Sequence, residues 1–223
     1  MFYNKIELYL NEVLPFYRSL PDEDKNNILA ISTFQHFKAY ELIQNNSNMC
    51  AGLIIVLDGQ LRSFMHSFTG KEITLFRLLS RDICILSASC IFKNLNYEIN
   101  IEAEKDSSVI ILDGNGLKSI SDSNISIQKY LFELSQNKLS DILWTFDQAL
   151  FSSLESRVAN FLIDQSNLDE SDILNLTHNK IANHLGTARE VVSRTLKKFE
   201  INGLIKLSRS SVEILDSNKL KDI

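Results

Sequence analysis

The segment that decides the fold runs from Leu176 to Asp216 and reads LTHNKIANHLGTAREVVSRTLKKFEINGLIKLSRSSVEILD. Thr177 is a favourable N-cap in front of a short amphipathic stretch, so a helix is predicted to begin there and to end at Leu185. Gly186 follows, and glycine readily adopts the positive φ that a tight turn after a helix requires. The first half of the segment therefore predicts a helix followed by a sharp turn.

A second helix is predicted directly after this turn. Thr187 is expected to cap it, with Glu190 three residues later as in a capping box. Asn202-Gly203 is expected to end it, and the short apolar runs 204–207 and 212–215 then read as the strands of a hairpin. Helix, turn, helix and two-stranded wing together predict a winged helix-turn-helix.

The second helix has one apolar face, with Val192, Leu196 and Phe199, and one polar face. An arginine can bridge O6 and N7 of guanine, and a carboxylate can accept from N4 of cytosine. The N-terminal part of a recognition helix reaches the bases, whereas lysines further out contact phosphates, which position the protein without reading sequence. The predicted DNA-binding residues are Thr187, Arg189, Glu190, Ser193, Arg194, Lys197, Lys206 and Arg209, with Lys198 as a solvated or phosphate-facing charge.

Other roles are open to the same side chains. Glu190 can simply cap its own helix, and Arg189 and Arg194 can pair with acidic neighbours. The charge distribution favours the interpretation that these side chains bind DNA. The whole chain carries −5, but residues 180–209 hold seven basic and two acidic residues, or +5, so the remaining 193 residues carry −10. A local basic patch of this kind is typical of a nucleic-acid contact.

THNKIANHLGTAREVVSRTLKKFE followed by NGLIKL and a hairpin resembles the DNA-binding domain of the Crp/Fnr family of bacterial transcription regulators. Arg189, Glu190, Val192 and Arg194 match the family signature Arg-Glu-x-Val-x-Arg, and Glu190-x-x-Ser193-Arg194 matches the Fnr branch. The resemblance implies a homodimer on a TTGA-like inverted repeat, in which Arg194 takes the guanine and Glu190 the cytosine opposite it. RNA polymerase is a further candidate partner, and no membrane contact is expected.

The rest of the chain fits the same order of parts, so we expect an α+β protein. Short helices are predicted before residue 30, one of them starting at Pro21. Short apolar runs between residues 34 and 112, separated by turns such as Asp58-Gly59 and Asp113-Gly114, predict a β-roll sensor domain of the jelly-roll or cyclic-nucleotide-binding-like type. The expected divisions are a sensor domain at 1–122, a dimerisation helix at 123–151 and the winged helix-turn-helix at 152–223.

The stretch from Ser123 to Phe151 contains no glycine or proline and is predicted to form one long helix. Its heptad-like seam favours pairing with a second copy, because the chain offers no other helix of matching length. A core helix of a single chain is the alternative. The predicted dimerisation residues are Phe132, Leu139, Ile142, Phe146 and Ala149, with Ser135 also on the seam.

The expected sensor domain lacks the family's best-known effector motifs. The cyclic-nucleotide version has a Gly-Glu-containing cassette followed by an arginine that holds the phosphate, but no arginine lies between Asp82 and Glu104 here. A buried phosphate would lack a compensating cation, so cAMP is not expected as the effector. An iron–sulfur sensor like Fnr needs four cysteines, and this chain has three, none before Cys50.

Several effector hypotheses remain open. Cys84 and Cys90, in CILSASC, lie where an effector pocket is expected and could sense oxidants, sulfur species or a soft metal, although free cysteines in apolar sequence are often plain core residues. A haem is conceivable, and an organic ligand or no small ligand fits equally well. The candidate haem ligands are His36, His66, Met49 and Met65.

Composition excludes several other classes of protein. With 223 residues, 44% hydrophobic and 23% charged, the chain is neither disordered nor a membrane-spanning protein. The N-terminus does not read as a secretory signal, and an odd number of cysteines argues against a disulfide scaffold, so a reducing cytoplasm is expected. No His-x-His or spaced His/Glu set predicts a metal site or an enzyme. A ligand-binding roll whose winged helix contacts protein is the remaining, disfavoured alternative; it predicts that alanine at Arg189 and Arg194 leaves target recognition intact.

Overall fold

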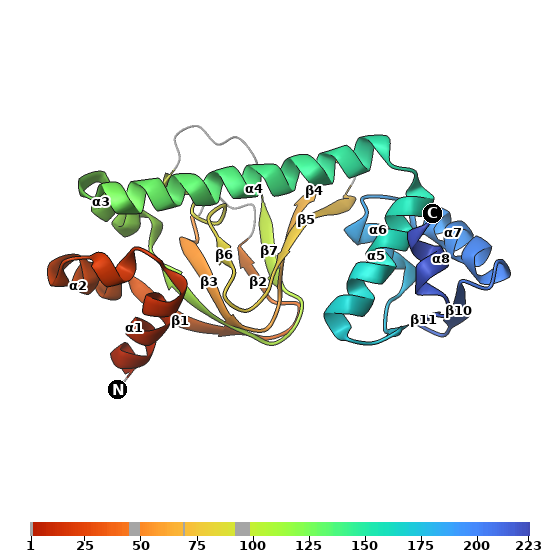
Figure 1. The fold of residues 1–223 in the computed structure, drawn as a ribbon, viewed down its shortest axis with the longest axis horizontal. Coiled ribbons are helices and arrows are strands. Elements are labelled where there is room, and N and C mark those ends of the chain that lie inside the picture. The colour runs from red at the N-terminus through yellow and green to blue at the C-terminus, as the bar shows by residue number, and fades with distance from the viewer. Residues whose placement is uncertain (1, 45–49, 69, 92–98) are drawn as a thin grey trace. The chain divides into compact units, whose positions relative to one another are not determined.

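The computed structural model describes residues 2–44, 50–68, 70–91 and 99–223 (Figure 1). The chain packs into two compact units, one formed by residues 1–65 and 75–142 and the other by residues 66–74 and 143–223. The division into a sensor domain, a dimerisation helix and a DNA-binding domain follows different boundaries and stays a prediction. No helix in the described part of the chain is long and apolar enough to cross a membrane.

The first unit opens with the predicted short helices and continues into two antiparallel four-stranded sheets, which confirms the expected β-roll. One sheet has the order β1-β8-β3-β6 and the other β2-β7-β4-β5. The helices are α1 (Phe2–Val13), η1 (Tyr17–Ser19) and α2 (Asp22–Ala30), and the strands are β1 (Ser32–Phe37), β2 (Leu42–Gln44), β3 (Leu53–Asp58), β4 (Leu61–His66), β5 (Glu72–Leu78), β6 (Ile83–Cys84), β7 (Asn100–Ala103) and β8 (Ser107–Leu112), with the one-turn helix η2 (Ser89–Ile91) between β6 and β7.

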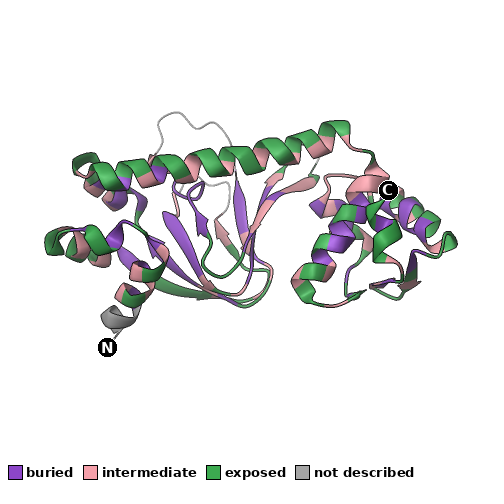
Figure 2. Ribbon diagram, in the orientation of Figure 1, coloured by how far each residue is buried: buried purple, intermediate pink, exposed green. Residues whose placement is uncertain are grey.

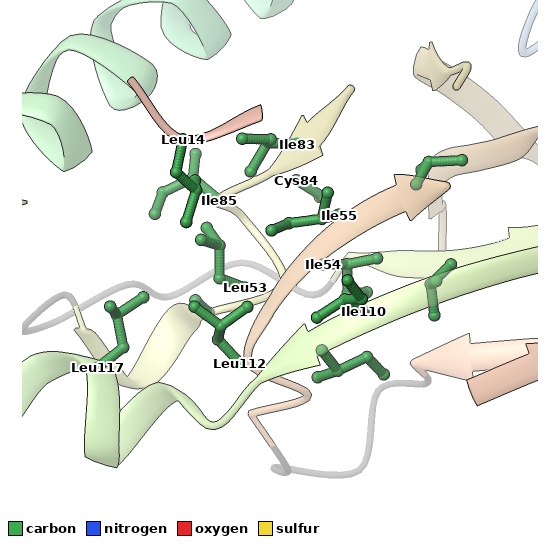
Figure 3. Close-up of a cluster of buried hydrophobic side chains, with 14 of the residues drawn as sticks. Leu14, Leu53, Ile54, Ile55, Ile83, Cys84, Ile85, Ile110, Leu112 and Leu117 are labelled. Carbon is green, nitrogen blue, oxygen red and sulfur yellow. The ribbon is translucent and has the colours of Figure 1, made fainter. Parts of the chain in front are cut away.

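The core of the roll is centred on β3 and β8. Ile54 of β3 pairs with Ile111 of β8, and four consecutive residues of β3, Leu53 to Val56, are almost fully buried. A strand that is apolar on both faces must be covered on both sides, and Leu10 of α1 and Leu14, directly after α1, belong to the same cluster. Figure 3 shows this cluster, with Cys84 among isoleucine and leucine side chains.

Two helices follow β8. Asp113-Gly114, which reads as a turn, instead starts α3 (Gly114–Ser123): Asp113 is the N-cap, and its carboxylate accepts a hydrogen bond from the backbone of Gly116 at 2.7 Å. The predicted long helix is confirmed as α4 (Ile125–Phe151). Ile127 and Leu131 of α4 are buried in the core of the roll.

The second unit contains the predicted winged helix-turn-helix. Its elements are α5 (Leu154–Asp169), β9 (Ile173–Leu174), α6 (His178–His184), α7 (Arg189–Ile201), β10 (Ile205–Ser208), β11 (Ser211–Ile214) and α8 (Ser217–Lys221). The wing has three strands in the order β10-β11-β9, because β9, which the sequence did not predict, pairs with β11. Val192, Leu196 and Phe199 of α7 are almost fully buried in the core of this unit, as predicted.

Candidate nucleic-acid interface

The turn between α6 and α7 is built by local backbone chemistry. The Thr177 hydroxyl accepts a hydrogen bond from the backbone of Lys180 at 3.2 Å, which confirms it as the N-cap of α6. Gly186 adopts a φ of 65°, a left-handed conformation that favours glycine. The turn then runs one residue further than predicted. Ala188 is the N-cap of α7, without a side-chain hydrogen bond, so the prediction that Thr187 caps this helix was wrong.

The polar face of α7 points away from its buried face. At about 100° of rotation per residue, positions 189, 190, 193, 194 and 197 share one arc, centred about 140° from the arc of the buried residues. Arg189, Glu190, Arg194 and Lys197 are exposed, and Ser193 is half-buried. Figure 2 shows this alternation of exposed and buried positions along α7. The predicted base-reading residues therefore share one accessible surface.

The side chains at the N-terminal end of this surface have no partners among the residues that the structure describes. In the described part of the chain, no hydrogen bond or ion pair engages the side chains of Arg189, Glu190 or Arg194. Glu190 does not cap its helix, and no acidic side chain of the described residues neutralises either arginine. Two arginine forks and one carboxylate are thus presented to solvent within two turns of helix, ready to form the bidentate and acceptor contacts that base edges offer.

The lysines around this surface are held differently. Lys197 forms an ion pair with Glu200 at 2.6 Å, Lys198 with Glu155 of α5 at 2.6 Å, and Lys206 with Glu213 across the wing at 3.6 Å. Exposed ion pairs of this kind contribute little to stability, so Lys197 and Lys206 can exchange their carboxylates for phosphates at small cost. Lys198, by contrast, pairs with α5, off the arc of the base-reading residues.

Glu200 also fastens the wing to α7. Its carboxylate accepts from Lys197 and, at 3.0 Å, from the backbone N–H of Leu207 in β10. These two hydrogen bonds lower the pKa of Glu200 below its usual value. At the tip of the wing, Arg209 is exposed and is followed by Ser210 with a φ of 63°. The wing arginine is therefore displayed on a turn that is tied back to α7.

Two side chains that the sequence reasoning missed support the helix-turn-helix. Nδ1 of His178, at the start of α6, lies 2.7 Å from the hydroxyl of Ser193, which joins the two helices and orients that hydroxyl. Arg157 of α5 donates a hydrogen bond to the carbonyl of Leu185, the C-cap of α6. Burial lowers the pKa of Arg157, as desolvation disfavours its charged form. No local motif marks either residue, because each acts through a contact distant in sequence.

The solvent-facing side of α4 carries an apolar stripe, and only some of its residues are those of the predicted seam. Ile142 packs against the core of the roll, and Ala149 is half-buried on the same side of the helix. Both therefore lie about 80–100° from the centre of the stripe, and the assignment of these two residues to the seam stays a prediction. Positions 132, 136, 139, 143, 146 and 150 fall within an arc of about 80°; five of them are the exposed Phe132, Leu139, Leu143, Phe146 and Leu150.

The cysteines are arranged differently from the sequence expectation. Cys84 is fully buried, and burial raises the pKa of its thiol. Cys90 is bonded to Cys50, which corrects both the expectation of free thiols and the grouping of Cys90 with Cys84. The two can bond because the fold brings the segment before β3 beside η2, a contact that sequence spacing does not reveal. Cys84 is therefore a core residue, and Cys50 and Cys90 are the cysteines that lie together in the fold.

The candidate haem ligands do not converge in the described part of the chain. His36 is exposed, with Nδ1 3.2 Å from the hydroxyl of Ser108, and Nε2 of His66 lies 3.3 Å from a carboxylate oxygen of Glu72. Met49 falls outside the described residues, and Met65 packs against the roll core. Among the described residues, no group of three or more His, Cys, Asp or Glu side chains is placed to hold a metal ion.

Known proteins share both the sequence and the fold. Residues 156–223 match the Crp-like helix-turn-helix domain. The transcriptional activator protein anr of Pseudomonas aeruginosa is 26% identical in an alignment of 196 positions that covers 82% of this chain and 77% of that protein. The crystal structure of a Crp/Fnr-family transcriptional regulator from Eubacterium rectale is 39% identical, covers 95% of this chain and 98% of its own, and superposes with a TM-score of 0.92. The chain therefore belongs to the Crp/Fnr family of transcription regulators.

Proposed function

We propose that the protein is a homodimeric regulator that reads a TTGA-like inverted repeat with α7. The observation that carries this proposal is the exposed end of α7, where Arg189, Glu190 and Arg194 have no partners among the described residues. A purely structural helix of a winged domain has no need of three unpaired ionic side chains on one face. A helix that must exchange water for base edges does, because each group finds its partner only on the correct sequence.

The residues divide into base readers and phosphate binders. Arg194 bridges O6 and N7 of the guanine, and Glu190 accepts from N4 of the cytosine opposite it. Ser193, oriented by His178, keeps hydrogen-bonding capacity for a base edge or a phosphate. The remaining contacts hold the helix in register on the backbone; they come from Thr187, Arg189, Lys197, Lys206 and Arg209.

Two copies of the recognition helix are needed for an inverted repeat. The α4 stripe of Phe132, Leu139, Leu143, Phe146 and Leu150 is exposed in the single chain and has the a/d spacing of a coiled-coil seam. Pairing of this stripe with its copy buries it and places two α7 helices for successive major grooves, about one helical turn of DNA apart. The protein works in the cytoplasm, responds to a signal at the roll other than cAMP, and has RNA polymerase as a candidate partner.

The test is a fluorescence anisotropy titration of the purified dimer on a TTGA inverted repeat and on a duplex in which the guanine is replaced. Arg194→Ala is expected to reduce discrimination between the two duplexes by roughly 1–3 kcal/mol, or about 5- to 150-fold. Lys206→Ala should weaken both duplexes alike and lower the salt dependence. Lys198→Ala is the matched control, because Lys198 pairs with Glu155 away from the base-reading arc.

The result can also reject the proposal. A wild-type protein that binds both duplexes equally at moderate salt has no sequence-reading helix. Discrimination that survives in Arg194→Ala moves the readout to other residues. Loss of discrimination in Lys198→Ala would show that the effect comes from disturbed folding of the winged domain rather than from a base contact.

A further inference from the structure

Cys50 and Cys90 form a bonded pair at one end of the roll. Cys50 lies two residues before Gly52 at the start of β3, and Cys90 lies in η2, 40 residues later. Their Cα atoms are 5.6 Å apart, within the range that disulfides occupy. The backbone N–H of Cys90 also points at the Cys50 sulfur, at 3.4 Å. The backbone therefore holds the two side chains together.

The bonded pair is more accessible to solvent than Cys84, the third cysteine of the chain. Cys50 and Cys90 are half-buried, whereas Cys84 is fully buried among the aliphatic side chains of the core (Figure 3). Thiol–disulfide exchange requires a thiolate to reach a sulfur atom, so access decides which cysteine reacts. A small dithiol or peroxide can meet Cys50 or Cys90 without opening the core.

The sulfur atoms also lie against the start of α3. A Cβ atom built on Gly114, the first residue of α3, would be closer than 3.0 Å to both sulfurs. Glycine is required here because the bonded pair leaves no room for a side chain. Two thiols that are no longer bonded must move apart to non-bonded contact, by rotation of a cysteine side chain or by displacement of η2, the segment before β3 or Gly114 itself.

The position of α3 links this site to the rest of the chain. Asn124 alone separates α3 from α4, and its side-chain oxygen accepts from the backbone of Ser126 at 3.1 Å at the start of α4. A displacement at Gly114 therefore reaches the N-terminal end of the helix to which the dimer seam is assigned above.

We propose that Cys50 and Cys90 are a reversible dithiol–disulfide site whose redox state sets the DNA affinity of the protein. The proposal rests on the function inferred above, and it names the signal received at the roll. Disulfides are rare in compartments that keep thiols reduced, and those that form there are usually redox-sensing or catalytic. A regulator that works on genomic DNA in such a compartment has no use for a permanent disulfide.

The chemistry is a two-electron exchange. For reduction, a thiolate of a dithiol attacks one of the two sulfurs and releases the other as a thiolate. The second thiol of the reductant then resolves the mixed disulfide. The products are the oxidised reductant and two protein thiols, so two electrons and two protons pass to Cys50 and Cys90. For oxidation, hydrogen peroxide converts one thiol to a sulfenic acid with loss of hydroxide, which is protonated to water, and the other thiol condenses with it and releases a second water.

The first measurement counts thiols in the full-length protein. Samples treated with dithiothreitol or with hydrogen peroxide, and then freed of reagent, are alkylated with N-ethylmaleimide before and after denaturation and weighed by mass spectrometry. The reduced protein is expected to take two labels in the native state and the third, on Cys84, only after unfolding. The oxidised protein is expected to take none natively and one after unfolding. Native labelling of Cys84, or failure of either reagent to interconvert the two forms, overturns the site.

The second measurement compares DNA affinity in the two states. The wild-type dissociation constant for the inverted repeat is expected to change by at least about fivefold between the reduced and oxidised forms. Cys50→Ser and Cys90→Ser should each abolish this response, and Cys84→Ala should keep it. Two separate serine variants guard against one that fails to fold. Equal affinities in the two wild-type states refute the control of DNA binding. If neither state prefers the inverted repeat, the proposed function is wrong. The thiol count then still decides whether Cys50 and Cys90 interconvert between dithiol and disulfide.

Discussion

Replacing Phe146 by alanine is expected to weaken the dimer far more than it weakens the fold. Phe146 is 53% exposed in the single chain and lies at one edge of the arc of about 80° that also holds Leu139 and Leu143. An aromatic side chain of this type buries about 200 Å² when fully covered. Pairing of α4 with its copy can therefore remove about 100 Å² of apolar surface at Phe146 from water in each protomer, and about 200 Å² in the dimer.

This area sets the size of the effect. At about 25 cal/mol per Å² the two copies contribute about 5 kcal/mol to association. Alanine keeps part of the contact and packing is never complete, so we expect a loss of about 3 kcal/mol, which raises the dimer dissociation constant about 100-fold. Sedimentation equilibrium over a range of protein concentrations measures this constant directly, without DNA and without any assumption about the operator.

Two controls separate dimer pairing from general damage. Phe68→Ala removes an aromatic side chain that is fully exposed outside α4 and should leave the dissociation constant within about threefold. Ile142→Ala removes a side chain that packs against the roll core, so it should lower the free energy of unfolding rather than the dimer affinity. A dimer that tolerates Phe146→Ala would refute the assignment of the stripe. A dimer that dissociates with Ile142→Ala as well as with Phe146→Ala would favour the seam predicted from the sequence, which contains both residues.

Three further outcomes follow from local contacts. Thr177→Ala should lower the free energy of unfolding by about 1 kcal/mol in urea titration, because it removes the N-cap of α6, whereas Thr187→Ala should change it by less than about 0.5 kcal/mol. The pKa of Glu200 is lowered in the folded protein, so its hydrogen bond to the wing is fully present above the ordinary carboxyl range and is lost as pH falls through the lowered pKa. Amide exchange of the wing, followed by NMR, should therefore accelerate only at acid pH. The variant Glu200→Gln should show faster exchange already at neutral pH. Breaking the bond between Cys50 and Cys90, which closes a loop with a sequence separation of 40, should lower the free energy of unfolding by about 4 kcal/mol in the chain-entropy model, and a loss below about 1 kcal/mol with dithiothreitol would contradict the bond's role in stability.

The helix-turn-helix was the most predictable part because its signals are local. Thr177 and Gly186 act within one turn of their own positions, and Asn202-Gly203 ends α7 in the same way. The same locality explains the error at Thr187. A threonine three residues before a glutamate satisfies the capping-box pattern, but the turn needs one more extended residue, and Ala188 takes the N-cap position.

Features that depend on contacts between residues distant in the chain could not be predicted from the sequence. Asp113-Gly114 was predicted to be a turn, yet Asp113 caps α3 and Gly114 is its first residue, where two sulfur atoms from other segments leave no room for a side chain. Cys84 and Cys90 lie close in sequence, but Cys90 bonds to Cys50 instead. In α4, both sides of the helix carry apolar residues, and only the position of the roll core shows that Ile142 belongs to the inner side.

The contrast between paired lysines and unpaired arginines bears on how specificity is achieved. Lys197 and Lys206 are exposed lysines whose carboxylate partners they can leave for phosphates at little cost, so under the proposed function we expect them to add affinity for any duplex. Glu190 acts in the opposite sense. An unpaired carboxylate is repelled by the DNA backbone, and it is desolvated at a penalty unless a cytosine amino group meets it. Under the proposed function we therefore expect Glu190 to penalise wrong sequences and Arg194 to favour the right one, so that discrimination arises from both the repulsive and the attractive contact.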